Sequence, residues 1–111
     1  MTTPLFHVIV YVPVTHADAI RSAMAEAGAG RIGNYDSCSF STRGTGRFRP
    51  LKGAHPAIGS EGRVEEVDEE RIEAVVKNED ITAVLDAVKK AHSYEEPAIH
   101  ILPMEEYRSF T

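Results

Sequence analysis

The fold depends on the segment VEEVDEERIEAVVK, residues 64–77. Its pattern fits two kinds of secondary structure, and each would give a different order of elements. A helical stripe is compatible with one set of its residues (Val64, Val67, Arg71 and Ala74). The alternation of a strand is compatible with another set (Ile72, Ala74 and Val76). If the segment is extended, the elements follow the order strand, helix, strand, strand, helix, strand. That order predicts an α+β fold, the ferredoxin-like βαββαβ sandwich.

The N-terminal part of the chain predicts a buried strand and an amphipathic helix. Residues 5–12 are apolar on both alternating sides, so we expect a strand whose two faces are both covered. Thr15 and Asp18 resemble a capping box that opens a helix ending near Ala27. Gly28 then stops the helix.

The rest of the chain predicts two short strands, a second helix and a last strand. In the glycine-rich middle third, residues 37–43 resemble a strand and residues 45–50 a return strand or a loop. Asn78 is expected to cap a helix that ends near His92, because acidic residues follow the cap and basic residues close the helix. An apolar run at residues 98–102 is the last strand.

The length and charge of the chain exclude several classes of protein. With 111 residues we expect one domain over residues 1–111, and the net charge of −5 argues against generic nucleic-acid binding. The longest uncharged apolar run, residues 5–14, is far shorter than the ~20 residues of a membrane span. No signal peptide is visible, and the unpaired Cys38 suits a reducing compartment, so we expect a cytoplasmic protein.

Charge is distributed unevenly along the chain. Residues 31–63 hold six basic and two acidic residues, which gives this segment a charge of +4 and the remainder −9. The acidic remainder includes a run at residues 65–70, which we interpret as a solvated face. Cys38 lies in an alternating segment and is interpreted as a small core residue.

Two stretches resemble a known family: GTGRFRPLKGAHPAIG, residues 44–59, and HSYEEPA, residues 92–98. They resemble the small inserted domain of YqfO-type members of the NIF-three family, which is similar in fold to CutA and PII signalling proteins. The resemblance implies a CutA/PII-like domain, here as a stand-alone chain, that assembles as a trimer. It does not extend to the two-metal site of the family, which lies in flanking domains. Ser93 departs from the usual His-Pro-Tyr pattern.

The basic glycine-rich loop is the first candidate site. Its glycines let the backbone approach a ligand closely, and its arginines are suited to a carboxylate or phosphate. The alternative is a structured hairpin whose arginines pair with carboxylates of other segments. The predicted ligand-binding residues are Arg43, Gly44, Gly46, Arg47, Phe48, Arg49, Gly53, His55 and Gly59.

The histidines form the second candidate site. His55, His92 and Glu95 are of the residue types that bind zinc, copper or manganese, so a divalent metal is the one cofactor considered. The alternative is that these histidines are packed or hydrogen-bonded without a metal.

These observations lead to one functional expectation and one alternative. We expect a noncatalytic trimeric module that binds a small anionic ligand or regulates a partner protein, without membrane or generic nucleic-acid binding. The alternative is a metal-binding or metal-tolerance protein. An enzyme with a site at the trimer interface has no direct support in the sequence, since no catalytic residues are identifiable.

Overall fold

A computed structural model describes residues 4–111 and shows a four-stranded sheet with two helices. The elements in chain order are β1 (Leu5–Pro13), α1 (Ala17–Ala27), β2 (Phe40–Phe48), β3 (Glu65–Lys77), α2 (Ile81–Ala91) and β4 (Ile99–Met104). Single 3-10 turns, Val14–His16 and Asn78–Asp80, precede the two helices, and another, Tyr107–Phe110, lies near the C-terminus. None of the helices within residues 4–111 is long and apolar enough to cross a membrane.

The sheet confirms the ferredoxin-like order. Its strands lie in the order β2-β3-β1-β4, and every neighbouring pair is antiparallel. The segment at residues 64–77 is therefore extended, as β3. It pairs with β1 on one side and with β2 on the other, which gives the strand the central position that its alternating buried residues require.

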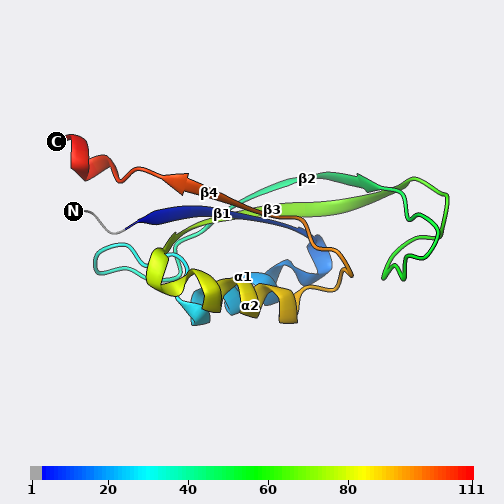
Figure 1. Cartoon of the computed structure of the whole chain (residues 1–111), viewed down its shortest axis with the longest axis horizontal. Coiled ribbons are helices and arrows are strands. Elements are labelled where there is room, and N and C mark those ends of the chain that lie inside the picture. The colour runs from blue at the N-terminus through cyan, green and yellow to red at the C-terminus, as the bar shows by residue number, and fades with distance from the viewer. Residues whose placement is uncertain (1–3) are drawn as a thin grey trace.

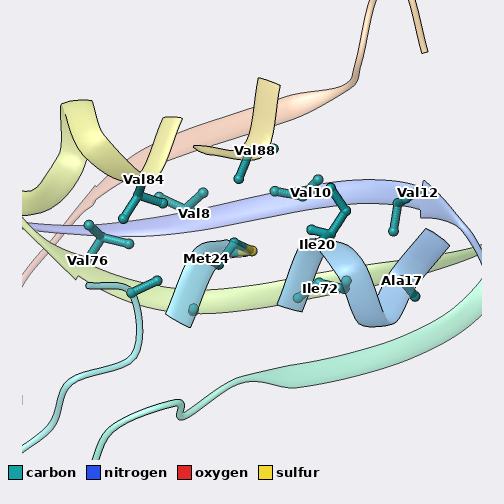
Figure 2. Close-up of a cluster of buried hydrophobic side chains, with 12 residues drawn as sticks. Val8, Val10, Val12, Ala17, Ile20, Met24, Ile72, Val76, Val84 and Val88 are labelled. Carbon is teal, nitrogen blue, oxygen red and sulfur yellow. The ribbon is translucent and has the colours of Figure 1, made fainter. Parts of the chain in front are cut away.

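Both helices cover the same face of the sheet (Figure 1). Val8, Val10 and Val12 of β1 point toward the helices and are fully buried (Figure 2). They pack with Ile20 and Met24 of α1, with Val84 and Val88 of α2 and with Ile72 and Val76 of β3. The apolar stripes predicted for the two helices are confirmed at these four helical positions.

Within residues 4–111 the opposite face carries no helix (Figure 1). Leu5, His7, Ile9 and Tyr11 of β1 lie on it, together with their directly paired neighbours on β3 and β4, because paired residues of antiparallel strands share a face. We call this surface the open face. Its centre is well packed even so, since Ile9 is only 3% exposed.

The middle third differs from the sequence prediction. No strand begins at residue 37 and no return occurs at residues 45–50; β2 starts at Phe40 and runs without a break through Gly44 and Gly46. Residues 49–64 then connect β2 to β3, so the two strands form a long hairpin (Figure 1). Gly46 suits the strand because a Cβ there would overlap the side chain of Glu69.

Cys38 and the two helix caps also differ from expectation. Cys38 lies before β2 and is half-buried, outside the hydrophobic core, because its segment is a bend tied to the backbone of Gly30. Neither Thr15 nor Asn78 caps a helix with its side chain. A 3-10 turn precedes each helix and supplies local acceptors for the first backbone N–H groups, which removes the need for a side-chain cap.

Candidate functional site

A cavity of about 470 Å³ lies between the end of β2, the connection 49–58 and the turn 94–98. These three segments meet where β3 continues past the end of β1, whose last residue, Pro13, is paired with Glu69. The turn that follows α2 reaches this position and lies against the hairpin. We call the cavity the Tyr94 pocket; its side chains include Phe48, Leu51, Ile58, Glu69 and Tyr94.

A carboxylate and a phenol form the polar part of the Tyr94 pocket. The Tyr94 hydroxyl donates a hydrogen bond of 2.9 Å to Oε2 of Glu69, whose residue is only 8% exposed. Burial raises the pKa of Tyr94 well above its ordinary value, and the hydrogen bond to Glu69 adds to the shift. The phenol therefore stays protonated at neutral pH and acts as a fixed donor.

The remaining wall is mainly apolar. The rings of Phe48 and Tyr94 meet edge to face with centroids 5.6 Å apart. Leu51 lines the cavity and is 62% exposed, so an apolar surface is available to a bound molecule. An apolar wall beside a few polar groups is the usual composition of a small-molecule site.

His92 fixes the turn that carries Tyr94. The backbone N–H of Tyr94 donates to Nδ1 of His92 over 3.1 Å. Since Nδ1 accepts, Nε2 carries the proton and donates to the carbonyl of Tyr11 over 2.7 Å. His92 thus joins the turn to β1 and has no nitrogen left for a ligand.

The predicted metal site is not assembled. His92 is occupied at both nitrogens, and His55 contacts Glu95 through its backbone N–H, 3.0 Å from Oε1, rather than through a shared metal position. Within residues 4–111 no group of three or more His, Cys, Asp or Glu side chains lies close enough to hold a metal ion. The structure therefore does not bring His55, His92 and Glu95 together, and their role as metal ligands stays a prediction.

The structure divides the predicted ligand-binding residues into two groups. Four of them line the Tyr94 pocket: Gly46, Arg47, Phe48 and Arg49. The other five do not: Arg43 and Gly44 lie earlier on β2, and Gly53, His55 and Gly59 lie in the connection beside residues that do. Nε of Arg47 lies 3.6 Å from Oε1 of Glu66. Pairing of the loop arginines with carboxylates of other segments is what the alternative of a structured hairpin predicted.

Two important residues were missed at the level of sequence. Glu69 belongs to the acidic run that was interpreted as a solvated face, yet it is buried. Tyr94 lies in the stretch that carries the family resemblance, and that was the one available signal for it. The pairing of these two residues depends on the contact between the turn and the hairpin.

Comparisons with known proteins agree with this architecture. The chain is 45% identical over 103 residues to the GTP cyclohydrolase 1 type 2 homolog of Halalkalibacterium halodurans, a match that covers 93% of this chain and 28% of that protein. A solved structure, that of the Bacillus cereus protein related to NIF3, superposes with a TM-score of 0.84 at 40% identity, covering 96% of this chain and 27% of that one. The chain is homologous to one segment of these NIF3-related proteins. No protein-family model matches it.

The chain spans about a quarter of the length of the curated relatives that it matches. CutA itself has the same fold: the protein from Archaeoglobus fulgidus superposes with a TM-score of 0.66 at 22% identity, covering 92% of this chain and 85% of that one. At this identity the likeness extends to the fold alone.

Proposed function

We propose that this CutA-like domain is a noncatalytic, homotrimeric module that binds a small ligand in the Tyr94 pocket and through it regulates a partner. The observation that carries the proposal is the cavity of about 470 Å³ with an apolar wall and a buried Glu69–Tyr94 pair. This volume is in the range of small-molecule sites, about 300–1,000 Å³.

Two arginines that line the pocket are suited to an anionic group of the ligand. Arg47 and Arg49 lie at the end of β2 and line the cavity, and both are exposed. A guanidinium group binds a carboxylate or phosphate through two parallel hydrogen bonds. The apolar body of the ligand would contact Phe48 and Leu51.

The open face supports the oligomer. Two helices cover one side of the sheet, while the other side presents apolar residues such as Leu102, which is 49% exposed. Covering this face with a second and third copy of the chain removes apolar surface from water. Tyr11 lies on the open face and also lines the Tyr94 pocket, so a neighbouring subunit would border the ligand.

A ligand screen by thermal unfolding tests the proposal. A ligand at 100 times its Kd stabilises the folded state by about 2.7 kcal/mol, which raises the Tm by roughly 10 °C. Arg47→Ala should abolish the shift produced by an anionic ligand. Arg31→Ala is the matched control, because Arg31 is exposed and outside the pocket.

Two further measurements on the same sample complete the test. Light scattering should give the mass of a trimer at micromolar concentration, and a monomer would contradict the shared-interface part of the proposal. Elemental analysis tests the metal-binding alternative. An anion screen without any shift in Tm would remove the ligand-binding proposal.

A further inference from the structure

We propose that Glu69 binds a cationic amino group, so that the ligand of the Tyr94 pocket is a small zwitterion rather than a simple anion. The inference rests on the proposed function, since it specifies the chemistry of the same site. It predicts a molecule with three parts: an ammonium group at Glu69, an anionic group near Arg47 and Arg49, and an apolar body between them.

Glu69 is buried, and no cationic side chain of the described residues pairs with it. The residue is 92% removed from solvent, yet no ion pair of Glu69 occurs within residues 4–111. A buried carboxylate without a partner of opposite charge is costly, because the water that stabilised it has been removed. An ammonium group brought by a ligand would supply the missing charge.

One oxygen of Glu69, Oε1, is available to a ligand. Tyr94 occupies Oε2, and no hydrogen bond to Oε1 occurs among the described residues. Oε1 lies over Gly46, where a Cβ would overlap it, and Gly46 itself lines the cavity. The glycine therefore leaves the space that this oxygen occupies at the wall of the pocket.

Acidic residues outnumber basic residues around the cavity. Among the described residues, Glu69, Glu95 and Glu96 line it together with two basic residues, Arg47 and Arg49. One of these two, Arg47, already lies 3.6 Å from Glu66. A simple anion would add negative charge to a wall that holds three carboxylates, whereas a zwitterion meets both signs.

Titration calorimetry of the unmodified chain with matched compounds tests the inference. The probes are leucine and phenylalanine, their N-acetyl derivatives, and the deaminated acids 4-methylpentanoate and 3-phenylpropionate. We expect at least one amino acid to bind at least tenfold more tightly than its N-acetyl and deaminated counterparts. Such a preference would arise only from the ammonium group, because the carboxylate and the apolar body are shared.

A substitution assigns the preference to Glu69. Glu69→Gln keeps an acceptor for the Tyr94 hydroxyl and removes the charge, so the tenfold preference should disappear. Glu79→Gln is the matched control: Glu79 is exposed in the turn before α2 and does not line the cavity, so its substitution should leave the preference unchanged. Far-UV circular dichroism establishes that both variants fold, and the comparison of probes on the unmodified chain does not depend on either variant.

The outcomes separate the two proposals. If the deaminated acids bind as tightly as the amino acids, the pocket binds anions and the zwitterion inference is overturned, while the proposed function stands. If the amino acids are preferred equally by the chain and by Glu69→Gln, the assignment to Glu69 is overturned. If neither these probes nor any member of the anion screen binds, the proposed function itself fails.

Discussion

The Tyr94→Phe substitution tests whether the hydrogen bond between Tyr94 and Glu69 stabilises the pocket. It removes the hydrogen bond of 2.9 Å that Glu69 receives from the hydroxyl and keeps the ring that contacts Phe48. No cavity is created, so the expected cost is that of one hydrogen bond to a buried charged group, about 2 kcal/mol. For a chain of this length the Tm should fall by roughly 10 °C.

Urea unfolding at a fixed protein concentration measures this loss as a lower midpoint with an unchanged slope. Tyr35→Phe is the matched control, because Tyr35 is 76% exposed, and it should change the free energy of unfolding by less than about 0.5 kcal/mol. In a Glu69→Gln background the same Tyr94 substitution should cost only about 1 kcal/mol, since a hydrogen bond between neutral groups is roughly half as strong. A Tyr94→Phe variant as stable as the Tyr35→Phe control would refute the reasoning.

The pH dependence of the unfolding free energy of Tyr94→Phe tests the raised pKa of Tyr94 independently. Burial raises the pKa of Tyr94 above the ordinary value of 10.0, so the folded chain holds this proton more tightly than the unfolded chain. The stabilisation is present in full below pH 10 and is lost as the pH rises above it. The difference in unfolding free energy between the chain and Tyr94→Phe should therefore narrow above pH 10; a constant difference would show that the phenol titrates normally.

Three further predictions concern stability. Ser93→Pro should raise the free energy of unfolding in urea by about 0.5–1 kcal/mol. The Ser93 hydroxyl is buried without a hydrogen-bond partner among the described residues, and His92 before it is already extended, as a residue before proline must be. A lower free energy of unfolding would contradict this. The hydrogen bond with His7 lowers the pKa of Glu73, so Glu73→Gln should lower the free energy of unfolding by about 0.5 kcal/mol at pH 6. The difference should vanish as the pH falls below about 4.5, and a loss that persists in acid would show that the carboxylate does not stabilise the fold. In the same assay Val84→Ala should lower the free energy of unfolding by about 2 kcal/mol, because Val84 is fully buried. The exposed control Val64→Ala should lower it by less than about 0.5 kcal/mol, and equal losses would place Val84 outside the core.

The periodic elements of the fold could be predicted from the sequence. Residues 5–12 and the apolar stripes of both helices have spacings that one element determines by itself, and the structure confirms them. The segment at residues 64–77 remained ambiguous because its apolar residues fit both spacings. Its identity as a strand depends on pairing with β1 and β2, which are distant in sequence.

Neither the extent of β2 nor the Tyr94 pocket could be predicted from local sequence patterns, because both depend on contacts between segments that are distant in sequence. Gly44 and Gly46 resemble residues that end a strand, but Gly46 is accommodated because Glu69 of the neighbouring strand covers it. The Tyr94 pocket combines the end of β2, the connection after it and the turn after α2. The sequence shows which residues are present in each segment, whereas only the packing of the turn on the hairpin brings Tyr94 to Glu69.

The central claim is that the Tyr94 pocket is the ligand site, and amide chemical-shift mapping by NMR tests it most directly. The titrant is the compound that raises the Tm most in the screen. We predict that the largest changes occur at Gly46, Phe48, Tyr94 and Glu95, which line the pocket. Changes centred instead on the open face, with these four amides unmoved, would contradict the account.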